Sequence, residues 1–243
     1  MHNKWYWAFK NVFIGPALRV WNRPWIEGVD NIPTEGPALV ASTHQSVMDS
    51  FFFPLVCPRQ IIFPAKSEYF TNTGIIGAIQ RWFFKVLAQV KVDRTATNAG
   101  DATQAAALEV LERGDVFAIY PEGTRSPDGR IYRGRTGMAR IALASGVEII
   151  PVAMIDSRRA NPIGTWIPRP VKVGMVVGEP IDGRAYVSSL GLDPDSREAV
   201  RPLTDHVMMI LAELAKQPYI NIYASEVKAS LAAGYGYPQG AEI

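Results

Sequence analysis

The stretch from residue 38 to 49, ALVASTHQSVMD, constrains the chain most, because it places a histidine at the end of an apolar run. Residues 37–42 predict a short buried strand, and residues 46–54 predict the start of an apolar helix. His44 then lies in the connection between them, and Asp49 falls in the first turn of the helix. An aspartate so placed fixes one imidazole nitrogen and leaves the other basic. The pair is a candidate general base with its orienting acid, although an ordinary buried histidine would fit the same spacing.

A second polar motif follows the apolar run DVFAI at residues 115–119, which predicts another strand. The motif is YPEGTRS, at residues 120–126, and it supplies a carboxylate, a glycine and a guanidinium. Arg125 offers a planar fork for a phosphate, and Gly123 allows the backbone to come close to a ligand. The loop is therefore a candidate anion site, while an ordinary turn with a salt bridge remains the alternative.

Together the two motifs resemble the glycerolipid acyltransferase family, through H-x4-D at His44 and Asp49 followed by PEGTRS. Further matches occur in the family's order, so the resemblance covers roughly residues 25–180: Lys66 in AKSEYF, VDR ending at Arg94, and IPVA at residues 150–153. Two departures are Tyr120, where phenylalanine is usual, and Lys91, where the family tends to have an aromatic or aliphatic residue.

The resemblance implies a membrane-associated enzyme that transfers a fatty acyl group from a thioester to the free hydroxyl of 1-acylglycerol 3-phosphate, giving phosphatidic acid for phospholipid biosynthesis. His44 would be the base and Asp49 its partner. The implied substrate-binding residues are Lys66, Arg94, Glu122, Gly123, Thr124 and Arg125. No bound cofactor or metal is implied. The co-substrate would be acyl-CoA or an acyl-acyl carrier protein.

Other functions stay open at this point. One alternative has glycerol 3-phosphate or another lysophospholipid as the acceptor, and another has a phospholipid as the acyl donor. A lipase or thioesterase would need a serine nucleophile, but the chain lacks a G-x-S-x-G motif, and Ser46 is the serine closest to the pair. An inactive membrane-binding protein is the alternative from a different class.

The rest of the chain alternates strands and helices, which predicts an α/β fold with a mainly parallel sheet covered by helices on both faces. Further strands are expected at residues 60–63, 90–92, 147–155 and 171–177, the last as a possible edge strand. Further helices are expected at residues 101–113, with Asp101 as N-cap, at 136–145 and at 195–216. Lys66 and Arg94 would then follow strands, as Arg125 does, and the three cations would converge near His44.

The N-terminal segment 5–21 is rich in aromatic residues and basic side chains and has no acidic residue. This pattern predicts an amphipathic helix at a membrane interface, kinked or divided at Pro16; a helix packed on the protein's own core is the alternative. Residues 74–86 form a second amphipathic candidate. The predicted organisation is an interfacial segment at 1–24, a catalytic domain at 25–217 and a loosely ordered tail at 218–243.

Composition limits the partners and the compartment. The balance of 25 basic and 23 acidic residues is nearly neutral, so nothing indicates nucleic acid, and no uncharged apolar stretch is long enough to span a bilayer. The single Cys57 excludes an internal disulfide and indicates a reducing environment. We therefore expect peripheral or monotopic binding to the anionic cytoplasmic face of the cell membrane. A run of arginines at residues 125–140 is a candidate site for phosphate, anionic lipid, coenzyme A or a carrier protein.

Overall fold

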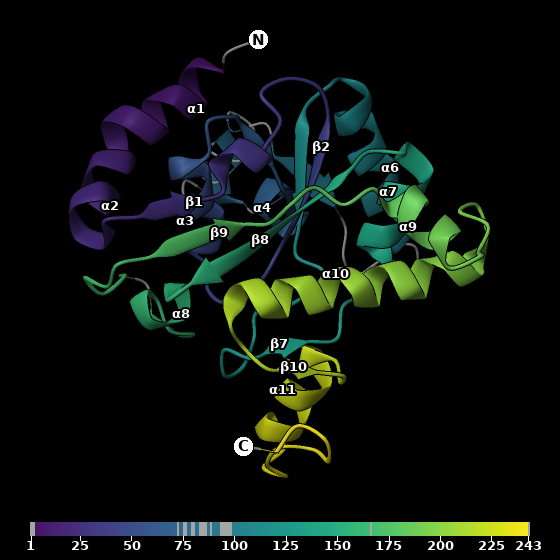
Figure 1. The fold of residues 1–243 in the computed structure, drawn as a ribbon. Coiled ribbons are helices and arrows are strands. Elements are labelled where there is room, and N and C mark those ends of the chain that lie inside the picture. The colour runs from purple at the N-terminus through teal and green to yellow at the C-terminus, as the bar shows by residue number, and fades with distance from the viewer. Residues whose placement is uncertain are drawn as a thin grey trace.

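A computed structural model describes residues 3–71, 73–74, 77–78, 81–82, 87, 89–92, 99–165 and 167–242 of the chain. Within these ranges, six strands form the central sheet, in the order β1-β9-β8-β2-β6-β3. Neighbouring strands are parallel except β8 and β9 (Figure 1). The mainly parallel sheet expected from the sequence is thus confirmed. The strands span Trp25–Glu27 (β1), Ala38–Ser42 (β2), Ile61–Ile62 (β3), Val116–Ile119 (β6), Ile149–Ile155 (β8) and Gly174–Val177 (β9).

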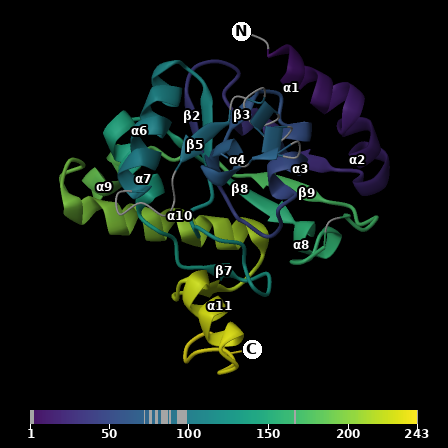
Figure 2. The ribbon, with the colours of Figure 1, turned by 180° about the vertical axis from the view of Figure 1, so that it is seen from behind.

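Helices cover both faces of this sheet, because its buried strands present apolar side chains alternately to each side. On β2, Leu39 and Ala41 enter one core cluster, whereas Ala38 and Val40 enter the other. The first cluster lies under α6 (Ala99–Glu112), α7 (Gly137–Ser145), α9 (Gly183–Ser189) and α10 (Val200–Ala215). The second lies under α2 (Gly15–Asn22) and α3 (Asp49–Val56), as Figures 1 and 2 show from opposite sides.

Three details differ from the sequence-based expectations. β9 is not an edge strand, because β1 pairs with its outer side. Asp101 is not an N-cap: α6 already begins at Ala99, and Asp101 in its first turn pairs instead with Arg140 at 3.4 Å. The helix expected from residue 195 starts later, with a 3-10 turn at Arg197–Ala199 that leads into α10.

The shorter elements surround this framework. β4 (Pro64–Lys66) and β5 (Val90–Val92) form a separate parallel pair, and β7 (Ile131–Tyr132) pairs with β10 (Tyr219–Ile220). The remaining short helices are the 3-10 turn Val29–Asn31, α4 (Glu68–Thr71) and α8 (Ser157–Ala160). Most of the amphipathic candidate at 74–86 lies outside the described residues. Among those described, no helix combines the length and the apolar character needed to cross a membrane.

The N-terminal segment divides into α1 (Lys4–Ala8), a π-helical turn at Phe9–Phe13, and α2. Pro16 stands in the first turn of α2, where a missing N–H does no harm. Gly15 is required at the break, because a Cβ there would lie 1.7 Å from the carbonyl oxygen of Lys10. Leu18 is buried in the core. The segment therefore packs on the protein and still exposes several large apolar side chains.

The C-terminal segment is not the loose tail expected from its composition. β10 pairs with β7, and α11 (Ala224–Ala232) follows it and lies below α10 in Figure 1. Tyr132, from far earlier in the chain, is buried together with Ala224 and Val227. A small core between distant segments orders this region, and sequence periodicity does not reveal such a core.

Candidate active site

His44 and Asp49 meet as the sequence predicts. The carboxyl ends of β2 and β6 adjoin, and His44 follows β2 while Asp49 opens α3. His44 Nδ1 lies 3.1 Å from Asp49 Oδ2. The imidazole is 18% exposed and Asp49 is fully buried. With Nδ1 donating to the carboxylate, the other ring nitrogen is left as a base for a ligand.

Asp49 also shapes the loop that carries the histidine. The backbone N–H groups of Gln45 and Ser46 donate to Asp49 Oδ2, at 2.7 and 2.8 Å. Three donors thus converge on one carboxylate oxygen, which stabilises a buried negative charge. The same contacts hold the backbone next to His44, so Asp49 orients both the imidazole and its loop.

Glu122 connects this loop to the second motif. Its Oε1 accepts from the backbone N–H of His44 at 3.2 Å, and its Oε2 accepts from that of Tyr132 at 3.1 Å. Burial raises the pKa of Glu122 to about 8, although these two N–H groups act in the opposite direction. A further backbone bond runs from Ser126 N–H to the His44 carbonyl, 2.8 Å. Glu122 therefore holds the base against the PEGTRS loop from inside the protein.

Tyr120 is the direct neighbour of the base. Its ring stacks on His44 with centroids 3.9 Å apart and planes inclined by 10°. Its hydroxyl forms a 2.8 Å hydrogen bond with Ser50 Oγ, and Phe63 stacks behind it at 5.5 Å. The three rings follow the adjacent strands β2, β6 and β3, so the order of the strands produces the stack.

The remaining residues of the PEGTRS loop face a different set of partners. Gly123 has φ of +73°, a conformation that glycine adopts without strain, and a Cβ there would approach Arg135 Cδ to 3.2 Å. Thr124 Oγ1 accepts a 2.8 Å hydrogen bond from Lys228 Nζ in α11. Arg125 is half-buried, and it makes no hydrogen bond or ion pair with any residue that the structure describes. Its guanidinium is available for an anion.

A cavity of about 640 Å³ reaches His44. Its walls are mainly apolar and come from the N-terminal helices and from α3, β3 and α7, including Tyr6, Phe9, Ile14, Leu18, Phe51, Leu55, Ile61 and Met138. Lys10 enters this wall and donates to the carbonyl of Cys57. Cys57 itself is buried in the core. Cavities of this size and polarity suit an elongated apolar ligand.

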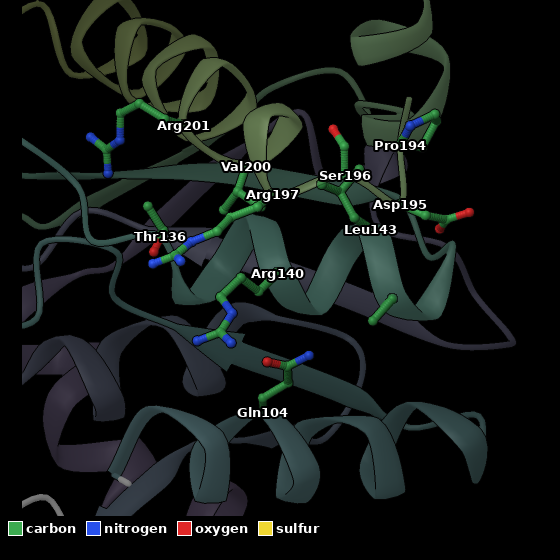
Figure 3. A pocket seen from close by; sticks show the side chains of 11 residues that line it. Gln104, Thr136, Arg140, Leu143, Pro194, Asp195, Ser196, Arg197, Val200 and Arg201 are labelled. Atoms are coloured by element: carbon green, nitrogen blue, oxygen red, sulfur yellow. The ribbon is translucent and has the colours of Figure 1, made fainter. Parts of the chain in front are cut away.

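A second cleft, of about 800 Å³, adjoins the first, and Thr136 and Arg140 line both. Figure 3 shows Arg140 extending from α7 towards Gln104 of α6, and Arg197 and Arg201 around the beginning of α10. Arg201 is held by Asp205 at 2.9 Å and by the Gly134 carbonyl at 2.7 Å. The guanidinium of Arg197 has no hydrogen bond or ion pair to a described residue. Asp195 also lines the cleft and pairs with Arg184 at 2.9 Å, so the guanidinium of Arg197 is the charge left here for an anionic ligand.

Two predicted cations remain outside the described geometry. Arg94 is not among the described residues. The backbone of Lys66 ends β4, so Lys66 lies within a strand of a separate small sheet and not in a loop after β3. The expected convergence of Lys66, Arg94 and Arg125 stays a prediction.

The arginine run at 125–140 mainly contacts the C-terminal segment, a role that the sequence did not indicate. Arg130 pairs with Asp128 at 2.8 Å and donates to the carbonyl of Ala241 at 2.6 Å. Arg133 and Arg135 lie over the ring of Tyr223, at 5.2 and 4.9 Å. Most of these guanidinium groups hold the C-terminal segment in place. Of the run, Arg125 is the group left for a ligand near His44.

The geometry disfavours a serine hydrolase. Ser46 is buried, and its hydroxyl bonds to Asn161 Oδ1 at 2.9 Å while accepting from the Met48 N–H at 3.0 Å. It is therefore engaged away from the imidazole. Across the described ranges, no group of three histidine, cysteine, aspartate or glutamate residues could hold a metal ion.

Sequence reasoning missed several residues around the base. Ser50, Arg158 and Lys228 reach the site from α3, α8 and α11. Ser50 could have been found from its place one residue after Asp49. The positions of Arg158 and Lys228 depend on long-range packing, and no local pattern indicates them.

Comparison with known proteins agrees with this geometry. A family model described as Acyltransferase matches residues 23–155. The crystal structure of the 1-acyl-sn-glycerophosphate acyltransferase PlsC from Thermotoga maritima superimposes with a TM-score of 0.63 at 25% identity, covering 88% of this chain and 78% of that one.

The curated relatives include further acyltransferases. A chloroplastic 1-acyl-sn-glycerol-3-phosphate acyltransferase of Arabidopsis thaliana is 29% identical over 65% of this chain and 43% of its own length. One from Bacillus subtilis is 28% identical over 68% of this chain and 74% of its own. The chain spans about half the length of the first curated relatives it matches.

Proposed function

The chain belongs to the acyltransferase family, and from this premise we propose that it acylates the free hydroxyl of 1-acylglycerol 3-phosphate, using an acyl thioester and producing phosphatidic acid. The observation that carries the proposal is the His44–Asp49 pair, 3.1 Å apart, beside an apolar cavity that His44 lines. A base at the wall of such a cavity suits an acyl transfer in which the acyl chain is buried and the hydroxyl is activated.

His44 Nε2 removes the proton of the acceptor hydroxyl as its oxygen attacks the thioester carbonyl carbon. The tetrahedral intermediate then collapses, the carbon–sulfur bond breaks, and the imidazolium returns the proton to the leaving thiolate. Asp49 stabilises the imidazolium and keeps Nδ1 protonated. General base catalysis of this kind contributes about 10²- to 10⁴-fold in rate, and positioning of the acceptor supplies much of the remainder. The protein contributes no covalent nucleophile.

The PEGTRS loop binds the acceptor in this proposal. Arg125, half-buried and without a partner among the described residues, takes the phosphate, and Gly123 and Thr124 supply the adjoining backbone and hydroxyl. Glu122 orders the loop through its two backbone hydrogen bonds. Lys66 and Arg94 are the further phosphate partners that the family resemblance implies.

The two cavities suit the two ends of the donor. The apolar cavity would take the fatty acyl chain, which leaves the thioester beside His44. The arginine-lined cleft would take the phosphate groups of acyl-CoA, or the phosphopantetheine arm and acidic surface of an acyl carrier protein. The shared wall at Thr136 and Arg140 makes the two regions neighbours, as one long ligand requires.

We place the enzyme on the cytoplasmic face of the cell membrane, held there through its N-terminal helices. Trp7, Phe13 and Val20 are 59%, 58% and 79% exposed. Trp21 donates to the carbonyl of Pro168 at 2.7 Å, which joins the exposed Ile167 to the same surface. Exposed aromatic residues together with Lys4 and Arg19 suit the interface of an anionic bilayer. The division into an interfacial segment at 1–24 and a catalytic domain at 25–217 stays a prediction, whereas residues 218–243 pack on that domain.

The central test is acyl transfer by purified full-length His44→Ala, assayed with labelled acyl-CoA and lysophosphatidate. We expect turnover to be lost while the thermal midpoint is kept, and Asp49→Asn to cost less. His206→Ala is the matched control, because His206 stacks on Tyr186 at 3.9 Å on another helix pair. Retention of more than a small fraction of wild-type kcat by His44→Ala would refute the mechanism.

A further inference from the structure

Lys228 reaches the candidate active site from the opposite end of the chain. Its Nζ donates to Thr124 Oγ1 at 2.8 Å, although the two residues are 104 positions apart. Lys228 lies in the middle of α11, and its side chain is half-buried. The family model matches residues 23–155, so this lysine lies outside the matched range.

The position of α11 is fixed by contacts at several points. Tyr219 of β10 pairs with Ile131 of β7, which begins a few residues after the PEGTRS loop. Val227 packs on the buried Tyr132, and Arg135 Nη2 donates to Ser225 Oγ at 3.1 Å. Ser225 and Val227 precede Lys228 by less than one helical turn, so these contacts fix the part of α11 that carries the lysine. The packing of α11 therefore sets the position of Lys228 over the PEGTRS loop.

Positive charge gathers at this point. Burial, together with the neighbouring guanidinium groups of Arg125 and Arg158, lowers the pKa of Lys228. Arg158 is anchored by a 3.0 Å hydrogen bond from its Nη1 to the carbonyl of Ser126. The carboxylate of Glu122 also acts on Lys228, but both of its oxygens already accept hydrogen bonds from backbone N–H groups.

Three cations close together repel one another, and none of the three forms an ion pair with a described carboxylate. Such an arrangement is costly without a ligand and becomes favourable when an anion binds between the charges. The Thr124 hydroxyl accepts its hydrogen bond from Lys228, so its own proton is available to donate to the same anion.

We propose that Lys228 of α11 binds the phosphate of the acceptor together with Arg125 and the Thr124 hydroxyl. This inference rests on the proposed function and makes the C-terminal segment part of the substrate site. A phosphomonoester carries up to two negative charges, and Lys228 supplies a point charge beside the planar fork of Arg125. Arg158 acts through Ser126 and keeps the loop in position.

The test compares full-length Lys228→Met, Lys228→Arg and the control Lys216→Met, an exposed lysine at the end of α10. Steady-state kinetics use lysophosphatidate and a monoacylglycerol with the same chain. We expect Lys228→Met to raise KM for lysophosphatidate about ten- to a hundredfold, as for a lost hydrogen bond to a charged group, with kcat little changed. Lys228→Arg should recover much of this loss, and the monoacylglycerol should not discriminate between the variants.

A binding measurement separates this inference from the proposed function. In the His44→Ala background, the Kd for lysophosphatidate is measured by titration with and without Lys228→Met. A weakening of tenfold or more supports the inference even if the wild-type protein does not acylate lysophosphatidate, a result that would refute the proposed function alone. An unchanged Kd refutes the inference. Equal losses on both acceptors would also overturn it, because they would show that Lys228 only ties α11 to the loop.

Discussion

The imidazole of His44 and the phenol ring of Tyr120 stack with centroids 3.9 Å apart and a 10° angle between planes. Asp49 fixes the ring by a hydrogen bond in its own plane, and Tyr120 restrains it from one face. The two contacts together leave the imidazole few orientations. Positioning of a general base matters because small displacements of the reacting atoms cost rate steeply.

Replacement of Tyr120 separates the ring contact from the hydroxyl contact. Tyr120→Phe keeps the stack and loses the bond to Ser50, which is worth about 0.5–1.5 kcal/mol, so we expect kcat within about tenfold of wild type. Tyr120→Leu loses the flat face, and we expect a larger fall in kcat than Tyr120→Phe shows. Single-turnover rates at saturating substrate give the comparison. Equal rates for the two variants would mean that the stack does not position the base.

Arg125→Lys tests the acceptor phosphate. Lysine keeps the charge but loses the bidentate fork, and hydrogen bonds to charged groups are worth about 1.5–3 kcal/mol. We therefore expect kcat/KM for lysophosphatidate to fall about ten- to a hundredfold, with little change for a monoacylglycerol. Arg113→Lys, at an exposed surface pair with Asp115, serves as control. A similar loss on both acceptors would assign Arg125 to the donor or to the structure of the loop.

Glu122 predicts a pH dependence of stability. Its pKa rises from 4.5 to about 8 on folding, so between these values the folded state binds more protons than the unfolded state. Its contribution to the free energy of unfolding is therefore complete below pH 4.5 and is lost as the pH rises to about 8. Denaturant titrations between pH 4.5 and about 8 should show that the free energy of unfolding of the wild type falls as the pH rises. The fall should be smaller for Glu122→Gln, because glutamine does not titrate.

In the same experiment Glu122→Gln should be less stable at pH 5, since its amide places a donor against one backbone N–H, a mismatch that costs about 1–3 kcal/mol. His206→Ala, at a residue that stacks on Tyr186 of α9 and not on the loop, serves as a titrating-residue control. Parallel pH profiles for the wild type and Glu122→Gln would show that another group dominates.

The proposed membrane surface is tested by substitution and not by deletion. Removal of the N-terminal helices would expose the core around Leu18 and open the cavity wall. The triple variant Trp7→Ser, Phe13→Ser, Val20→Ser changes exposed side chains only, and burial of each in a membrane is worth about 1.5–3 kcal/mol. We expect at least tenfold weaker binding to anionic vesicles, with unchanged turnover of a micellar acceptor.

The matched control replaces exposed apolar residues elsewhere, at Leu190, Met209 and Tyr235. That protein should sediment with vesicles like the wild type. Undiminished vesicle binding by the N-terminal triple variant would place the membrane contact on another surface.

Arg197 tests the arginine-lined cleft as the site of the donor's anionic end. Arg197→Ala removes a guanidinium that has no partner among the described residues, and we expect KM for acyl-CoA to rise about tenfold. An acyl-pantetheine thioester, which lacks the nucleotide, should be unaffected. Arg113→Ala is the control. If only the acyl carrier protein donor responds, the cleft recognises the carrier; if neither donor responds, the donor lies elsewhere.

The sequence by itself determined the His44–Asp49 pair, the strands that precede His44 and Tyr120, and the alternation that yields a mainly parallel sheet. These follow from local geometry: His44 lies just ahead of the first turn that Asp49 opens, and apolar runs between turn residues form buried strands. The PEGTRS loop was likewise evident as a polar motif at a strand end.

Only the tertiary structure decided what surrounds the pair. Tyr120 covers His44 because β2 and β6 are neighbours in a register that aligns Ala41 with Ile119. Lys228 reaches Thr124 because β10 pairs with β7, 104 positions separating the two side chains. Such contacts depend on which distant segments pack into one core. The free energy of that packing depends on the whole folded chain, so a local sequence pattern does not predict it.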